Sequence, residues 1–141
     1  MCPMEPSGSR LGPIVDNEVN VLVVEDDPLI AAHLEAIVES RHDRKVSIAA
    51  DAETALSLAE SLQPPVAIVD VRLKGAIDGL TVGRELKETF GTTLVFVTAH
   101  LDEAVRHFPE RGVLFVGKPF LDQDVLKALD QALESRKARH S

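Results

Sequence analysis

Five short runs of apolar residues follow one another along the chain, and none of them alternates with polar residues. The runs are rich in Val and Ile and span residues 19–24, 46–49, 66–69, 93–97 and 113–116. Continuous β-branched runs of this length are typical of strands that are buried on both faces, as in a parallel sheet. The pattern therefore predicts five buried strands.

Between these runs, apolar residues recur at the spacing of amphipathic helices. Acidic residues, which are favoured N-caps, stand where such helices would begin: Asp27 (before Pro28), Asp51, Asp78 and Asp122. The fourth helix, over residues 102–108, is predicted to be brief because Pro109 follows it. Alternating strands and helices predict an α/β fold, a doubly wound five-stranded parallel sheet with helices on both faces.

Ionisable or hydroxyl side chains follow four of the five predicted strands. They are Glu25, Asp26 and Asp27, then Asp70, then Thr98, then Lys118. The carboxyl ends of parallel strands share one edge of the sheet, where ligands bind. Crowded carboxylates favour a cation such as Mg2+ (or Mn2+), lysine suits a phosphoryl oxygen, and aspartate can attack phosphorus. The set predicts a site at which an aspartate is reversibly phosphorylated.

The composition narrows the class of protein. The chain has 141 residues, which predicts one domain, and a formal net charge of −8, which argues against direct nucleic-acid binding. No apolar run reaches the roughly 18 residues that a membrane helix needs, and the start lacks the pattern of a secretory signal. We therefore expect a cytoplasmic protein that makes no membrane contact. The Pro- and Gly-rich residues 1–18 are predicted to be a flexible tail.

Five short motifs stand at or near the ends of the apolar runs. They are Val23-Val24-Glu25-Asp26-Asp27, Val69-Asp70-Val71-Arg72-Leu73, Asp78-Gly79-Leu80, Val97-Thr98-Ala99 and Lys118-Pro119-Phe120. In this order they resemble the receiver domain of two-component response regulators, over about residues 19–136. The resemblance implies a flavodoxin-like three-layer sandwich. Residues 19–141 would then be a receiver domain of the stand-alone, single-domain type, with no output domain.

The resemblance also implies a role for each site residue. Asp70 would be the phospho-acceptor, and Thr98 and Lys118 would contact the phosphoryl group. The metal ligands would be Glu25 (through water), Asp26, Asp70 and the backbone carbonyl of Arg72. The Lys118–Pro119 peptide would be cis, and Phe115 would be an aromatic switch residue. Arg72 and His100 would tune the lifetime of the phosphorylated state.

Two segments depart from the commonest pattern of the family. The loop from Asp70 to Asp78 is about one residue longer than usual. The segment from Thr98 to Lys118 is short, so we expect a stunted or irregular fourth helix. We therefore do not expect the fourth helix, the fifth strand and the fifth helix to form the family's usual dimerisation surface.

We interpret the chain as a single-domain response regulator that is a self-modifying switch and not a turnover enzyme. Its partners would be a sensor histidine kinase or a histidine phosphotransfer protein, and a downstream protein target. Two alternatives remain open: an aspartate-nucleophile phosphatase of the haloacid dehalogenase type, and a receiver-like interaction module that is never phosphorylated. The phosphatase would need Asp-x-Asp after the first strand, where this chain has Glu-Asp-Asp-Pro.

Overall fold

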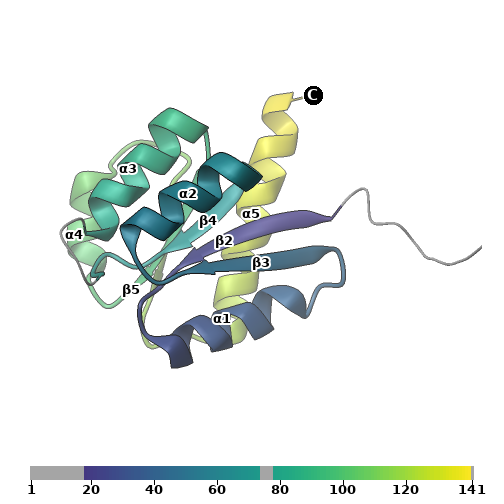
Figure 1. The fold of residues 1–141 in the computed structure, drawn as a ribbon, viewed down its shortest axis with the longest axis horizontal. Helices are drawn as coiled ribbons and strands as arrows, with labels where there is room; N and C mark the ends of the chain where they lie inside the picture. The colour runs from purple at the N-terminus through teal and green to yellow at the C-terminus, as the bar shows by residue number, and fades with distance from the viewer. Residues whose placement is uncertain (1–17, 74–77, 141) are drawn as a thin grey trace, which may run out of the picture.

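A computed structural model describes residues 18–73 and 78–140, the side chains of 138–140 excepted. Five parallel strands form one sheet in the order β3-β2-β4-β5-β6 (Figure 1). The strands are β2 (Val19–Val24), β3 (Arg44–Ala49), β4 (Val66–Val69), β5 (Thr93–Thr98) and β6 (Leu114–Gly117). The helices are α1 (Pro28–Glu39), α2 (Ala52–Leu62), α3 (Gly79–Phe90), α4 (Leu101–His107) and α5 (Asp122–His140).

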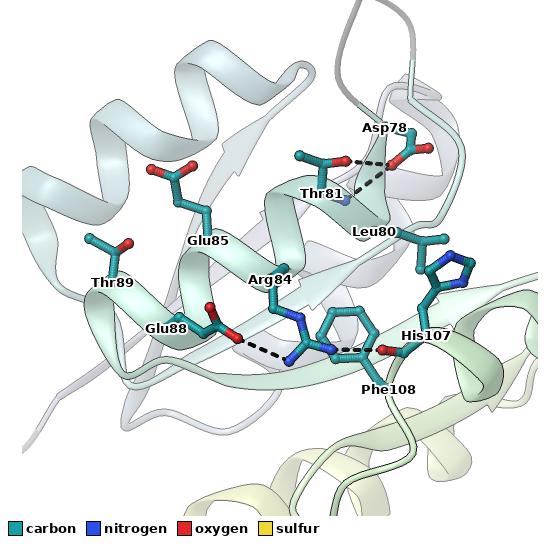
Figure 2. A pocket seen from close by; sticks show the side chains of 9 residues that line it. All are labelled: Asp78, Leu80, Thr81, Arg84, Glu85, Glu88, Thr89, His107 and Phe108. Atoms are coloured by element: carbon teal, nitrogen blue, oxygen red, sulfur yellow. Dashed lines mark hydrogen bonds and ion pairs between the residues drawn. The ribbon is translucent and has the colours of Figure 1, made fainter.

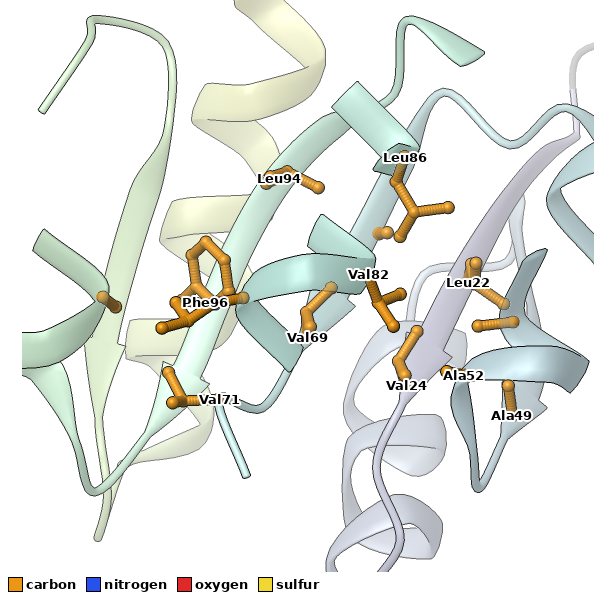
Figure 3. Close-up of a cluster of buried hydrophobic side chains, with 14 of the residues drawn as sticks. Leu22, Val24, Ala49, Ala52, Val69, Val71, Val82, Leu86, Leu94 and Phe96 are labelled. Carbon is orange, nitrogen blue, oxygen red and sulfur yellow. The ribbon is translucent and has the colours of Figure 1, made fainter. Parts of the chain in front are cut away.

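The central strands bury side chains on both faces, which explains their unbroken apolar runs. In β2, Leu22 and Val24 face α2 and α3, whereas Val21 and Val23 face α1 and α5. β4 and β5 divide their residues between the two faces in the same alternating way. Figure 3 shows the first face, where Val82 and Leu86 of α3 lie over the sheet. The result is a three-layer sandwich with two separate apolar cores.

Three helices begin at capping residues that the sequence indicated, whereas the fourth indicated residue, Asp122, is itself the first residue of α5. The carboxylates of Asp27, Asp51 and Asp78 accept hydrogen bonds from backbone N–H groups in the first turns of α1, α2 and α3. These bonds satisfy donors that would otherwise lack a partner at a helix start. α2 and α3 end at Gln63 and Gly91, which both adopt left-handed backbone conformations. The helix boundaries are therefore encoded locally.

The predicted fold class is confirmed, and the boundaries differ by only one or two residues. β3 begins at Arg44 instead of residue 46, and β6 spans 114–117 instead of 113–116. α4 begins at Leu101 and, as expected, is short, with seven residues. The predicted tail lies outside the described residues except for Glu18, and so does the middle of the long loop, residues 74–77. No helix among the described residues is long and apolar enough to cross a membrane.

The strand order decides where the site forms. β2 and β4 are neighbours in the middle of the sheet, whereas β3 is an edge strand. The connections from β2 and from β4 leave toward opposite faces, so a crevice opens between their carboxyl ends. Ala49, the last residue of β3, and Ala50 after it end an edge strand to one side of this crevice, as their apolar character suggested.

Burial in α1 gives a direct test of the packing. Leu34 is 1% exposed and Leu29 is 80% exposed, although both lie on the same helix. We expect Leu34→Ala to lower the free energy of unfolding by about 2–5 kcal/mol, because it removes buried apolar contacts and leaves a cavity. The matched variant Leu29→Ala should change it by about 0.5 kcal/mol or less. Urea denaturation followed by circular dichroism measures both, and equal effects would contradict the described burial.

Candidate functional site

Three carboxylates meet where β2 and β4 end. Glu25 and Asp26 follow β2, Asp70 follows β4, and the two strands pair in parallel with Val24 opposite Val69. One carboxylate oxygen from each of the three acids lies within 4.8 Å of the others. Glu25 and Asp70 are buried, and Asp26 is partly exposed. The register of two neighbouring strands thus brings together acids that lie 44 residues or more apart in the sequence.

The ammonium group of Lys118 joins two of these acids. Its Nζ lies 2.9 Å from Oε1 of Glu25 and 2.8 Å from Oδ2 of Asp70. Lys118 follows β6, and its backbone N–H donates to the carbonyl oxygen of Thr98 at the end of β5. The Lys118–Pro119 peptide is cis, as predicted. The lysine side chain therefore reaches from the edge of the sheet back to its centre.

Burial and these ion pairs set the charge balance of the site. Burial raises the pKa of Glu25, and the hydrogen bonds from Lys118 and the Asp27 N–H counter this only in part. Burial also lowers the pKa of Lys118, but hydrogen bonds to Asp70 and Glu25 outweigh it, so this pKa is raised above its usual value. The lysine therefore stays charged, while Glu25 carries its charge at a cost to folding.

The backbone around Asp70 is held by close contacts on both sides. The N–H of Asp70 donates to the carbonyl oxygen of Val24, and the N–H of Gly79 donates to that of Val71 at 2.7 Å. A Cβ at Gly79 would lie 1.7 Å from the carbonyl oxygen of Asp70, much closer than two non-bonded atoms can approach. Position 79 therefore requires glycine, so that the start of α3 can pack directly on the Asp70 backbone.

Thr98 lies at the end of β5 and is fully buried. Its Oγ1 accepts a hydrogen bond of 3.0 Å from the backbone N–H of His100. Together with Lys118, it lines a hollow of about 470 Å³ between the strand ends and α4. The structure thus places Thr98 and Lys118, two of the predicted phosphoryl contacts, along one cavity.

The predicted switch and tuning residues have different surroundings. Phe115 is partly buried on β6, and its ring stacks on Phe96 with the ring centroids 6.0 Å apart. His100 and Arg72 are exposed and line the same hollow as Thr98. The Arg72 guanidinium binds Glu103 of α4 at 3.0 Å and does not contact the acids. The role of the Arg72 carbonyl as a metal ligand stays a prediction.

Glu103 is the residue that the sequence reasoning did not single out. It lies in the first turn of α4 and pairs with Arg72, 31 residues earlier in the chain. Acidic residues in a first helical turn are common because they suit the helix dipole, so nothing in the sequence marks this one. Only the folded chain shows that it faces the loop after Asp70.

A second hollow, of about 600 Å³, lies on the outer side of α3 and involves none of the clustered acids (Figure 2). There the Arg84 guanidinium lies 4.1 Å from the centre of the Phe108 ring and donates to the carbonyl oxygen of His107. Arg84 also pairs with Glu110, and this hydrogen bond holds the pKa of Glu110 at about 2. This arrangement fastens the end of α4 to α3.

The chemistry available at the sheet edge follows from its donors. Three carboxylates within reach of one point suit a hard divalent cation such as Mg2+, which prefers oxygen ligands. The raised pKa of Glu25 fits such an ion, because a positive charge nearby would favour the ionised carboxyl. Asp70 presents a carboxylate that can act as a nucleophile, beside a lysine and a threonine that can hold the oxygens of an anion.

Comparison with known proteins matches most of the chain to one family. A family model described as the response regulator receiver domain matches residues 21–130. The phyllosphere-induced regulator PhyR of Methylorubrum extorquens is 30% identical over 119 residues, which cover 84% of this chain and 45% of that protein. The positive alginate biosynthesis regulatory protein of Pseudomonas aeruginosa is 34% identical over 117 residues, which cover 81% of this chain and 47% of that protein. The chain spans about half the length of these relatives.

Solved structures show the same fold. The receiver domain of PhyR from Erythrobacter litoralis superposes with a TM-score of 0.75 at 26% identity, covering 83% of this chain and 91% of that one. NtrX from Brucella abortus, in complex with ADP, superposes with a TM-score of 0.79 at 26% identity, covering 87% of this chain and 29% of that one.

The raised pKa of Glu25 predicts how stability depends on pH without metal. A carboxyl whose pKa is higher in the folded state favours folding below its unfolded pKa of about 4.5 and loses that contribution as pH rises. We therefore expect Glu25→Gln, which mimics the neutral form, to unfold at higher urea than the wild type at pH 7 in a chelator. The difference in urea midpoint between the variant and the wild type should shrink toward pH 4. A variant less stable than the wild type at pH 7 would contradict this.

Proposed function

This chain belongs to the response regulator receiver domain family, and we propose that it is a phosphorylation switch whose acceptor is Asp70. In the proposed step, an Asp70 oxygen attacks a phosphohistidine of a partner protein. The new P–O bond forms as the P–N bond breaks, and the electron pair returns to the imidazole nitrogen. The domain assists its own modification and is itself the product, so we propose a switch and not a turnover enzyme.

One observation carries this proposal: Asp70 is a buried carboxylate in the middle of the acidic cluster and is held by a single lysine. Its Oδ2 contacts Lys118, and its Oδ1 lies 3.5 Å from the backbone N–H of Arg72. Two acids lie beside it. Such a carboxylate is oriented before any reaction begins, and positioning together with charge stabilisation supplies most of the catalysis in phosphoryl transfer.

We propose that Glu25, Asp26 and Asp70 hold Mg2+ (or Mn2+), with Glu25 acting through water and the Arg72 carbonyl as a further ligand. The bound ion would neutralise charge on the phosphoryl oxygens and on the crowded acids. Asp26 is the most exposed of the three and can reach an entering ion directly. Lys118, already in contact with Glu25 and Asp70, supplies a second positive charge.

We propose that Thr98 and Phe115 change conformation in response to the phosphoryl group. Thr98 ends β5, the strand that pairs with β4, and in the proposed switch its hydroxyl group would turn from the His100 N–H toward a phosphoryl oxygen. Phe115 stacks on Phe96, one of the largest buried side chains of the core. A shift at the end of β5 would therefore change how the Phe115 ring packs. Arg72 and His100, at the mouth of the hollow, would set how fast water reaches the phosphoryl group.

The phosphodonor would be a sensor histidine kinase or a histidine phosphotransfer protein, and the surface beside the site suits such a partner. Leu29 and Leu121 are 80% and 62% exposed. His33, one turn after Leu29 on α1, stacks on Phe120 and binds Asp122, the residues on either side of Leu121. An apolar patch thus borders the carboxyl edge of the sheet, where a partner's phosphohistidine would have to enter. Signalling onward would be a contact with a downstream protein.

Phosphorylation itself is the first test. We expect acetyl phosphate with Mg2+ to add one phosphoryl group to the wild type, seen as a mass increase of about 80 Da that mild alkali or hydroxylamine removes, as for an acyl phosphate. Asp70→Asn should remain unmodified. The matched variant Asp78→Asn, which alters an exposed capping acid in the same connection, should still be modified. An unmodified wild type would overturn the proposal, and labelling of Asp70→Asn would assign the acceptor elsewhere.

Metal binding can be measured by stability because the chain has neither Trp nor Tyr for fluorescence. We expect a large excess of Mg2+ over its dissociation constant to raise the free energy of unfolding of the wild type by about 2–3 kcal/mol, by mass action on the folded state. Asp26→Asn should lose most of this gain, whereas Asp51→Asn, at the start of α2, should keep it. Equal gains in all three proteins would place the ion elsewhere.

A further inference from the structure

The ion pair between Arg72 and Glu103 joins the loop after Asp70 to α4. The Arg72 Nη2 lies 3.0 Å from the Glu103 Oε1, and the arginine side chain is 60% exposed. Both residues line the hollow that also holds Thr98 and Lys118. The guanidinium therefore lies at the mouth of the site but is turned toward the helix and away from the acids.

We propose that Glu103 is a positioning residue that competes with a phosphoryl group on Asp70 for the guanidinium of Arg72. The proposal rests on Asp70 being the phospho-acceptor. In the unphosphorylated protein, Glu103 holds Arg72 on α4. After phosphorylation, Arg72 leaves Glu103 and binds the phosphoryl oxygens, so that the tie between the loop and α4 is broken.

Charge and reach support this exchange. A phosphoryl group adds negative charge and three strong acceptor oxygens, two residues from Arg72 in the chain. A guanidinium can bind such oxygens through two parallel N–H groups. The present contact of Arg72 with Glu103 is a single hydrogen bond of 3.0 Å. Lys118, by contrast, already contacts two carboxylates. Arg72 is thus a cation at this hollow whose present contact is exposed and easily exchanged.

Breaking the contact between Arg72 and Glu103 would affect α4 because this helix has few anchoring contacts. α4 has seven residues, its first turn has no side-chain cap, and Ala104 is its one buried residue. The Arg72 pair holds its beginning, and the backbone of His107 at its end is held by Arg84. Losing the first of these ties leaves the beginning of α4 held by Leu101, which packs on Gly117, and by the His100 N–H, which donates to Thr98. The phosphoryl group would in this way act on α4 through a charge, in addition to any movement of Thr98.

The test is a double-mutant cycle on the binding of beryllofluoride, a tetrahedral anion that binds an aspartate carboxylate as a mimic of the phosphoryl group. Affinity is measured with Mg2+ by calorimetry on the full chain. We expect Glu103→Gln to tighten binding about two- to five-fold, the range that an exposed ion pair supports. In an Arg72→Ala background, the same Glu103→Gln change should have no such effect, because the contested cation is absent.

Asp102→Asn is the matched control, because it removes the same charge from the same turn of α4. Asp102 is exposed and lines the same hollow but makes no ion pair among the described residues. Thermal unfolding of both single variants should agree, so that a difference in affinity reports positioning and not folding. Equal affinities for Glu103→Gln and Asp102→Asn would overturn the inference, as would a Glu103 effect that survives Arg72→Ala. A wild type that neither binds the anion nor accepts a phosphoryl group would overturn the proposed function as well.

Discussion

Two buried carboxylates, Glu25 and Asp70, are placed side by side by the pairing of β2 with β4, and both accept hydrogen bonds from one ammonium group, that of Lys118. Like charges at this separation repel strongly where water is largely excluded. The lysine offsets that repulsion, and it comes from a strand that is not adjacent to either acid's strand. The two hydrogen bonds of Lys118 therefore tie the end of β6 to the ends of β2 and β4, and the site exists only while that arrangement does.

The buried sheet explains why the polar residues are where they are. Because β2, β4 and β5 are covered on both faces, their interior positions must be apolar, as Leu22 and Val23 are. Polar side chains of the site gather at the strand ends and just past them, where the crevice between β2 and β4 opens. The close approach of Gly79 to the Asp70 carbonyl then fixes the position of the Asp70 backbone. One constraint, burial on both faces, thus leads to both the core and the site.

Most of the fold, and the acids of the site, could be predicted from the sequence because local patterns encode them. The unbroken Val- and Ile-rich runs marked the strands, and Asp27, Asp51 and Asp78 marked the helix starts. Contacts between distant segments could not be predicted in this way. Nothing local shows that Lys118 contacts both acids or that Arg72 turns to Glu103, since each depends on how crossovers bring separate loops together. The resemblance to a family supplied roles for residues, but not the directions of their side chains.

The elements of the fold are not held equally firmly, and this decides where a charge added at Asp70 can act. α3 buries five residues, among them Leu80, Val82 and Leu86, whereas α4 buries Ala104 alone. α1 and α5 share a second apolar core with the sheet. Elements with few buried contacts open or shift at the lowest free-energy cost. A change of charge at the sheet edge should therefore be taken up by α4 and by the neighbouring strands β5 and β6, which carry Thr98 and Phe115, while the rest of the sandwich stays as a rigid frame.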